Sequence, residues 1–317
     1  MKINVSRSVL LIFCLCLPTM AGDNLPTDAS ALFQHALVAT DIWSQGPFHL
    51  HAIVAVKAGA KDLSGHYDLY WVDKNKWRDE LTVDRAGVLR IGMDGRIWSK
   101  PVAGAMALVS LEVQQLINIP GYLTLLSHFT FEERTPTKTG LSPAECLKLK
   151  ERAGLIERQP CFEAGSGLPL GGTGLHYDDF AEFGTKKFPR SMTYDAEDYW
   201  KVNLKVEKLV KALFPNPSMF APPDQKHLKA GCFHVVAPIP IIDLATSIIV
   251  DGKQLRNRTT MWIITSIDAR GAPKHHEIVG PFPLPQIPGI QGFRYQPATC
   301  EGIPVESQMV MKVKMDR

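Results

Sequence analysis

The sequence predicts an α+β protein with mainly antiparallel strands, arranged in two domains. First, the chain ends in a segment, Val305 to Met315, that alternates between apolar and mainly polar residues. A period of two is typical of a half-buried strand, whose apolar face needs partner strands upstream. Second, several earlier segments alternate in the same way and are separated by polar turns. Third, a proline-rich stretch at residues 214–225 divides the 317 residues into a large and a small unit.

The start of the chain has the composition of a secretory signal peptide, residues 1–21. Lys2 and Arg7 precede an apolar run from Val9 to Leu17, and we expect cleavage near Ala21. This run is shorter than the ~20 residues of a membrane span, so we expect no transmembrane segment after cleavage and a periplasmic or secreted protein. An uncleaved anchor is the alternative. Loss of the two basic residues changes the formal net charge from +3 to +1, which gives no indication of nucleic-acid binding.

Four of the six cysteines remain after this cleavage, in an oxidising compartment. Local pairing, Cys146–Cys161 and Cys232–Cys300, gives one disulfide to each predicted domain, and we expect this arrangement. The other two pairings, or four free thiols, are the alternatives.

Helices are expected in three parts of the large unit. Thr27 or Asp28 is a candidate N-cap before apolar residues at helical spacing. Residues 108–126 also have a helical pattern. A third helix is expected from Ser142-Pro143 to about Gly154, because proline favours a helix start and glycine a helix end.

Strands are expected in most of the remaining large unit, with a flexible loop at residues 165–174. One hairpin turns at Asp94-Gly95, since this pair favours positive φ. The expected strand segments are residues 48–56, 65–72, 76–83, 87–100, 176–183, 188–197 and 199–209.

The small unit contains partners for the terminal strand. Residues 259–279 are expected to form a strand, an Asp-Ala-Arg-Gly turn and a second strand. With the terminal strand they make a three-stranded antiparallel sheet, which is roughly the minimum for independent stability.

Residues 226–317 resemble the carboxy-terminal domain of TonB-type energy transducers. The resemblance implies a small α+β domain that contacts an envelope protein by adding a strand. For this contact it points to Trp262, Ile264, Val305, Met309 and Met311. The residues that match the family pattern are Ile267, Asp268, Gly271, Phe293, Tyr295, Pro297, Ala298, Gly302, Pro304 and Val305.

Residues 22–225 resemble the LolA/LolB type of periplasmic lipoprotein carrier and the related envelope-stress sensor domains. The matching features are Gly65 followed by "YDLYW", then "KWRDE", "MDGRIW" and "SMFAPPD". The resemblance implies an open antiparallel β half-barrel with covering helices, whose apolar concave face receives acyl chains.

Apolar and aromatic residues that alternate on successive strands are the candidates for such a ligand site. Burial of these side chains is favourable whether lipid or protein covers them, so an ordinary filled core is an equal alternative. The candidates are Tyr67, Leu69, Trp71, Trp77, Leu81, Leu89, Ile91 and Trp98.

The sequence gives little indication of a metal site. His49 and His51 share a strand face near His66, but no second ligand cluster accompanies them, and we expect exposed strand histidines. His275 and His276 are adjacent and point to opposite faces of a strand.

Catalytic motifs are also missing. The loop at residues 165–174 lacks both the nucleophile elbow and the phosphate-loop pattern. The acidic residues Asp178, Asp179 and Glu182 lack calcium-loop spacing, so we expect a solvated strand end. We therefore expect no metal, no cofactor and no enzyme.

The function expected from these observations is binding, in the cell envelope and without catalysis. The half-barrel would bind a hydrophobic ligand or lipoprotein acyl chains, and the small domain would contact an envelope protein. The alternatives are a sensor or scaffold that carries no ligand, and a hydrolase with an unrecognised site.

Overall fold

The computed structural model describes residues 28–100, 102, 104–139, 142–150, 157–172, 174–195, 200–214, 216–230, 233, 238–241, 259–279, 294–300 and 302–315. The helices are α1 (Ala29–Thr40), η1 (Ile42–Gln45), α2 (Gly104–Ile117), α3 (Ile119–Leu126), η3 (Pro217–Phe220) and η4 (Gln225–His227). The strands are β1 (Phe48–Ala58), β2 (Lys61–Asp73), β3 (Lys76–Val83), β4 (Ala86–Met93), β5 (Arg96–Ser99), β6 (Thr130–Thr139), β7 (Ser142–Lys150), β8 (Glu157–Arg158), β9 (Cys161–Glu163), β10 (Pro169–Gly172), β11 (Leu175–Phe183), β12 (Lys186–Asp195), β13 (Trp200–Lys211), β14 (Lys229–Ala230), β15 (Ile239–Ile241), β16 (Thr259–Ile267), β17 (Pro273–Val279), β18 (Arg294–Gln296), β19 (Ala298–Cys300), β20 (Ile303–Val305) and β21 (Ser307–Met315).

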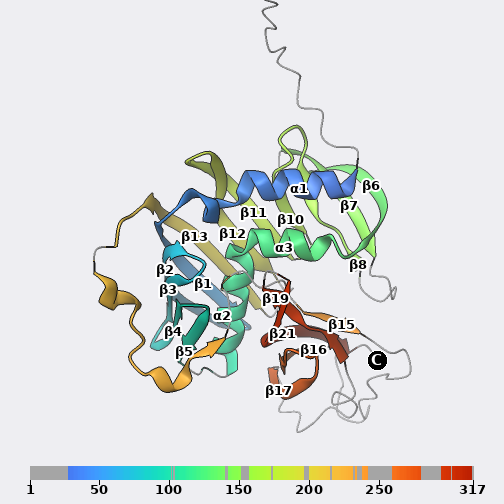
Figure 1. Cartoon of the computed structure of the whole chain (residues 1–317). Helices are drawn as coiled ribbons and strands as arrows, with labels where there is room; N and C mark the ends of the chain where they lie inside the picture. The colour runs from blue at the N-terminus through green and yellow to red at the C-terminus, as the bar shows by residue number, and fades with distance from the viewer. Residues whose placement is uncertain are drawn as a thin grey trace, which may run out of the picture.

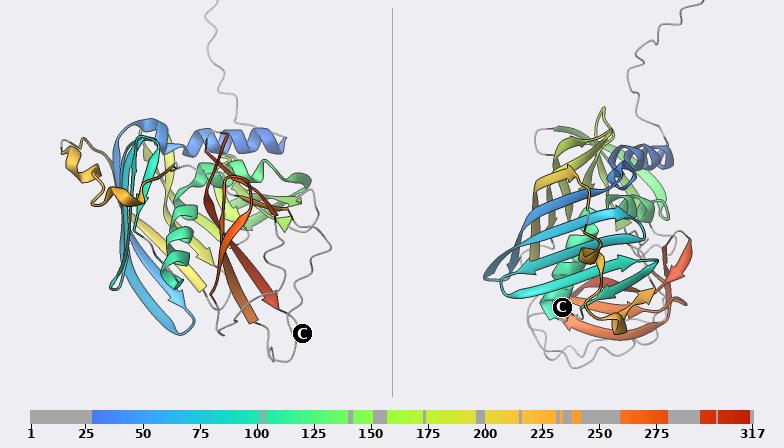
Figure 2. Two further views of the ribbon diagram at one scale, coloured as in Figure 1. Left: turned by 60° about the horizontal axis from the view of Figure 1, so that its bottom comes forward. Right: turned by 60° about the vertical axis from the view of Figure 1, so that its left-hand side comes forward.

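An open antiparallel sheet of 14 strands forms most of the molecule. Its order is β14-β5-β4-β3-β2-β1-β13-β12-β11-β10-β9-β7-β6, and β8 pairs with β7. The sheet curves, and helices α2 and α3 lie in its hollow (Figures 1 and 2). The expected α+β class and open sheet with covering helices are therefore present.

The helices cover the hollow because their apolar faces pack against it. Asp28 caps α1 by accepting a hydrogen bond from the Ser30 backbone N–H, so the expected N-cap is confirmed. Leu32, Phe33 and Ala36 of α1 are buried, as are Leu108, Val113 and Leu116 of α2 and Leu123 and Leu126 of α3. Together with the inner face of the sheet they form one hydrophobic core.

Two local expectations were wrong. Residues 142–150, expected as the start of a helix, form strand β7, which pairs with β6 on one side and with β9 and β8 on the other. Backbone pairing on both sides and the disulfide override the local helical preference, which is a weak guide on its own. Within the expected loop at 165–174, Pro169–Gly172 form strand β10, which pairs with β9 and β11.

The small three-stranded sheet is present, in the order β17-β16-β21. Its central strand, β16, places Trp262 and Ile264 in the same core as the large sheet. The Trp262 ring lies 6.1 Å from the Trp200 ring of β13. The Gly104 backbone N–H at the start of α2 donates to Glu277 Oε1 of β17 at 2.6 Å. The small sheet thus packs beside α2 (Figure 2).

The chain crosses between the two sheets later than the proline-rich stretch suggests. Residues 229–230, beyond the expected boundary at 225, form β14 and pair with β5 at the edge of the large sheet. The edge of the half-barrel therefore includes residues of the segment expected to belong to the second domain.

The disulfide Cys146–Cys161 is formed between directly paired residues of β7 and β9. Cys300 is also disulfide-bonded. Its expected partner, Cys232, lies outside the described residues, as does the expected signal peptide. Within the described ranges, no helix combines the length and the hydropathy that a membrane crossing requires.

Candidate ligand-binding site

Five of the eight predicted lining residues share the helix-covered inner face of the sheet. Tyr67, Leu69 and Trp71 alternate along β2, and Trp77 and Leu81 lie opposite them on β3. All five are at most 3% exposed. The inner face is thus as apolar and aromatic as predicted, and the chain's own side chains fill it.

The other three predicted residues, Leu89, Ile91 and Trp98, project from the outer face of the sheet. In the β3–β4 register, Trp77 pairs with Gly92 and Leu81 with Val88, so the even-numbered residues of β4 face inward. Ile91 pairs with Trp98 across the β4–β5 hairpin and shares its side.

This part of the prediction is corrected because the two faces of β4 look alike in sequence. The segment after β13 explains why both faces of β4 are apolar. Phe220 of η3 is 1% exposed, and η3 packs against the outer face of β3 and β4. Both faces of β4 are therefore covered, and both carry apolar side chains.

A cluster of charged and polar residues lies on the inner face, beside the apolar residues predicted to line the site. Asp79 of β3 is 2% exposed and accepts hydrogen bonds from the Tyr67 hydroxyl at 3.0 Å and from Arg90 Nε at 3.0 Å. Arg90 Nη1 donates to Gln114 Oε1 of α2, and Gln114 Nε2 donates to Ser110 Oγ at 2.9 Å. The cluster links the sheet to the helix that covers it.

The pKa shifts show that Tyr67 and Arg90 keep their protons. Burial, reinforced by the charge of Asp79, raises the pKa of Tyr67 well above its usual value. Burial alone would lower the pKa of Arg90, but the charge and hydrogen bonds of Asp79 outweigh it, so the Arg90 pKa is raised. Arg90 and Asp79 therefore form a buried, charge-assisted pair.

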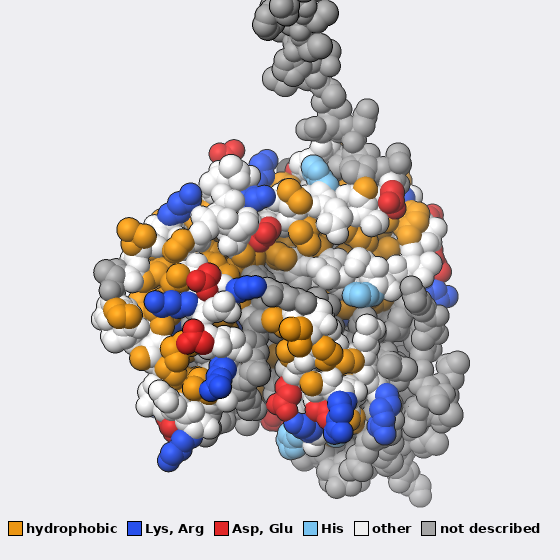
Figure 3. All heavy atoms as spheres, in the orientation of Figure 1, with side chains coloured by type: hydrophobic (Ala, Val, Ile, Leu, Met, Phe, Trp, Pro, Cys, Tyr) orange, Lys and Arg blue, Asp and Glu red, His pale blue; other side chains and the backbone are white. Residues whose placement is uncertain are grey.

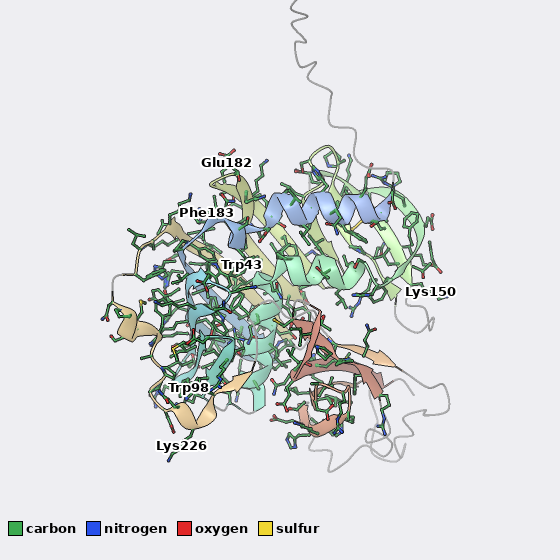
Figure 4. The ribbon with its side chains drawn as sticks, in the orientation of Figure 1. Trp43, Trp98, Lys150, Glu182, Phe183 and Lys226 are labelled. Atoms are coloured by element: carbon green, nitrogen blue, oxygen red, sulfur yellow. A yellow bond between two sulfur atoms is a disulfide. The ribbon has the colours of Figure 1, made fainter. Side chains whose placement is uncertain are left out.

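A groove opens where the first helix meets the β2–β3 hairpin. Its volume is about 530 Å³, and it is lined by Leu37, Asp41, Trp43, Ser44, Gly46, Trp71, Val72, Asp73, Lys74 and Pro120. The Trp43 and Trp71 rings meet edge to face with their centroids 4.9 Å apart. Trp43 lies below α1 in Figure 4, whereas Trp98 lies beside β5. The groove offers an aromatic wall with acidic and basic residues at its rim.

Trp43, Asp79 and Arg90 were not among the residues predicted from the sequence. Trp43 lies in η1, just after the first helix, so no strand pattern selected it. Asp79 shares its face of β3 with Trp77 and Leu81, and Arg90 is its partner on β4. Strand alternation therefore places both charged side chains on the same face of the sheet. The alternation of the strands thus indicated these two positions, but only apolar residues were predicted to line the site.

The histidines of β1 form a polar cluster on the outer face. His49 Nε2 and His51 Nδ1 lie 2.8 and 2.9 Å from the same oxygen, Asp68 Oδ1, and the His49 ring stacks on Tyr70 at 4.5 Å. Their side chains are 17% and 30% exposed, so they are half-buried rather than exposed. The described residues contain no group of three or more His, Cys, Asp and Glu that could hold a metal ion.

A second polar group is buried in the other half of the hollow. Glu112 of α2 is 1% exposed, and its Oε2 atom has no hydrogen-bond partner among the described residues. Burial raises the pKa of this carboxyl well above its ordinary value. The Tyr177 hydroxyl of β11 is likewise buried without a partner in the described part of the chain.

Among the predicted protein-contact residues, Trp262 and Ile264 cannot offer a strand edge. They lie in β16, which is paired on one side with β17 and on the other with β21. Met309 and Met311 lie in β21, at an edge of this sheet as described, and Val305 ends β20, which pairs with β19. Figure 3 shows hydrophobic side chains on the near face of this region, above a group of charged residues.

Among comparisons with known proteins, only the comparison with solved structures finds similar chains. No protein-family model and no curated protein matches the chain. A LolA superfamily protein from Nitrosomonas europaea overlaps with TM-score 0.39 and 10% identity, covering 62% of this chain and 99% of that one. A DUF1329 family protein from Desulfovibrio piger overlaps with TM-score 0.41 and 10% identity, covering 61% and 96%. The protein MucB overlaps with TM-score 0.32 and 13% identity, covering 88% and 97%.

These similarities are too low to carry a conclusion about function. None of the three structures is a TonB-type domain, so the resemblance expected for residues 226–317 has no support from the comparisons.

Proposed function

We propose that the chain is a non-enzymatic binding protein of the bacterial cell envelope, whose half-barrel binds an acyl chain. The groove beside Trp43 and Trp71 carries this proposal, because these two rings line it and also belong to the hydrophobic core of the hollow. Ligand sites are typically concave and mostly apolar, with a few polar groups that fix orientation. Asp41, Asp73 and Lys74 at the rim supply such polar groups.

The inner face is closed and filled in this structure, so a ligand enters by taking the place of protein atoms. The residues proposed to contact it are Tyr67, Leu69, Trp71, Trp77 and Leu81, which share that face. Burial of apolar surface is worth about 25 cal/mol per Å², whether an acyl chain or a protein side chain covers it. An acyl chain can therefore replace a side chain at little net cost.

Native mass spectrometry of residues 22–317, purified without detergent from a bacterial envelope, tests the proposal. We expect an adduct with the mass of a lipid, confirmed by organic extraction, that is lost when Trp71 or Trp77 is replaced by alanine. Trp98→Ala is the matched control: it removes an indole that is 6% exposed but on the outer face, and it should keep the adduct. A bare protein mass, when a known carrier keeps its lipid in the same procedure, would reject acyl-chain binding.

A second candidate function is a sensor or scaffold that carries no ligand. The filled inner face favours it. So does the small sheet, in which β17 and β21 each have one neighbour among the described strands. An extended segment of another envelope protein would add to one of these edges through backbone hydrogen bonds. If residues 22–317 retain an envelope partner in a pull-down but give a bare mass, this second function is the correct one.

A further inference from the structure

A phenylalanine from the segment between the two sheets occupies the aromatic end of the hollow. Phe233 follows β14, and its ring lies among three indoles of the inner face. The ring centroids are 4.7 Å from Trp43, 5.4 Å from Trp71 and 5.0 Å from Trp77, in tilted or edge-to-face geometry. Such geometries are the favoured ones for aromatic pairs. The three indoles are called the tryptophan box below.

The box and the surface groove share two walls. Trp43 and Trp71 line the groove, and both also contact the Phe233 ring. On its inner side the Phe233 ring meets Trp77 and the guanidinium of Arg90, whose central carbon lies 6.0 Å from the ring centroid. Phe233 therefore stands between the groove and the interior residues proposed to bind an acyl chain.

Phe233 belongs to none of the elements that build the hollow. The box residues come from η1, β2 and β3, whose backbones pair with their own neighbours or lie against α1. Phe233 instead lies three residues after the end of β14 in the sequence, outside the described helices and strands. Phe233→Ala therefore changes no residue of a described strand or helix.

We propose that Phe233 is an intramolecular competitor for the acyl-chain site, and that a bound acyl chain takes its place in the tryptophan box. The inference rests on the proposed function and specifies how that site is regulated. A site that is free only part of the time binds with an affinity reduced by that fraction. The Phe233 ring, by occupying the tryptophan box, thus lowers the apparent affinity for acyl chains.

Binding of dansyl-undecanoate to residues 22–317 tests the competition, with energy transfer from tryptophan to dansyl as the readout. Phe233→Ala should lower the apparent Kd by at most about 10- to 100-fold, the range for full burial of one phenylalanine side chain, since Phe233 is partly buried. Phe233→Leu should give a smaller gain, because leucine fills part of the box. Phe233→Leu also decides the question if the alanine variant does not fold.

Phe220→Ala is the matched control. Phe220 is 1% exposed, but it lies beside Phe214 at 5.8 Å on the outer face, so its loss should destabilise the fold without changing the Kd. Equal Kd values for the wild type and both Phe233 variants would overturn the competition and leave acyl-chain binding intact. Absence of binding in every variant would overturn the proposed function and the competition together.

Discussion

Asp79 and Glu112 are two buried carboxylates whose surroundings give them different roles. Asp79 has a charged partner, Arg90, and a hydroxyl donor, Tyr67, so it keeps a stable position on the sheet. Removal of one partner from a buried ion pair typically costs 3 to 5 kcal/mol, roughly, because the other charge is left unpaired. Glu112 Oε2 has no such partner among the described residues, and burial raises the pKa of its carboxyl, which favours the neutral form.

The raised pKa of Glu112 predicts a pH-dependent stability. Its pKa in the folded protein is raised above the ordinary value of 4.5, so the unfolded chain ionises first as the pH rises. The stability of the wild type is therefore fully present below that ordinary pKa and declines as the pH rises toward the folded pKa. Glu112→Gln should remove this decline, since glutamine does not titrate.

Urea unfolding of both proteins at several pH values between about 4 and 8 measures the effect. The free energy of unfolding of Glu112→Gln minus that of the wild type should grow as the pH rises. Glu182→Gln, at an exposed position of β11, should show a constant difference. A difference that stays flat for Glu112→Gln would mean that folding does not raise the pKa of this carboxyl.

The register between β3 and β4 decides which side chains of β4 face the hollow. Gly92 pairs with Trp77, and a Cβ atom at Gly92 would lie 2.0 Å from Trp77 Nε1. The glycine thus leaves the space in which the indole lies flat against the neighbouring strand. The same register turns Arg90 toward the hollow and Ile91 away from it.

Gly92→Ala should displace the Trp77 indole and destabilise the protein by about 1 to 3 kcal/mol, as overpacked core positions do. Gly87→Ala in the same strand is the control, because its nearest contact would be 3.8 Å away and its cost should be below about 0.5 kcal/mol. Urea unfolding followed by tryptophan fluorescence measures both. Equal stabilities of the two variants would show that Trp77 repacks without cost.

At the scale of the whole molecule, the small sheet and the half-barrel share one core. Trp262 is fully buried, and its ring lies 6.1 Å from that of Trp200, while Glu277 accepts the Gly104 backbone N–H at the start of α2. The small sheet therefore adds apolar surface and a helix-end hydrogen bond to the half-barrel. Unfolding of one part should weaken the other.

Trp262→Ala should cost about 3 to 5 kcal/mol, the usual range for a buried tryptophan. It should also increase hydrogen exchange in β13 and α2, which lie outside the small sheet. Ile303→Ala, at a side chain 68% exposed, should change neither. Faster exchange confined to β16, β17 and β21 in Trp262→Ala would show that the two sheets are energetically independent.

Local patterns in the sequence were sufficient to predict most strands of the large sheet. The Asp94-Gly95 hairpin is present, with positive φ at both residues, and so is the three-stranded sheet around β16. Residues 142–150 were misassigned because the proline start and glycine end are local signals, which the pairing of β7 with β6 and β9 outweighs. The residues predicted on β2 and β3, where one face is clearly apolar, lie on the inner face, whereas those predicted on β4 and β5, where both faces are apolar, lie on the outer face.

The sequence by itself determined the period-two strands, the turns between them and the aromatic content of the inner face, since each depends on neighbouring residues alone. Only the tertiary structure decided which residues meet across the hollow. Phe233, Trp43 and Trp77 come from three separate parts of the chain, and strand pairing and burial alone bring them together. The charge pair of Asp79 and Arg90 depends in the same way on the β3–β4 register, because a shift of one residue would turn Arg90 to the outer face.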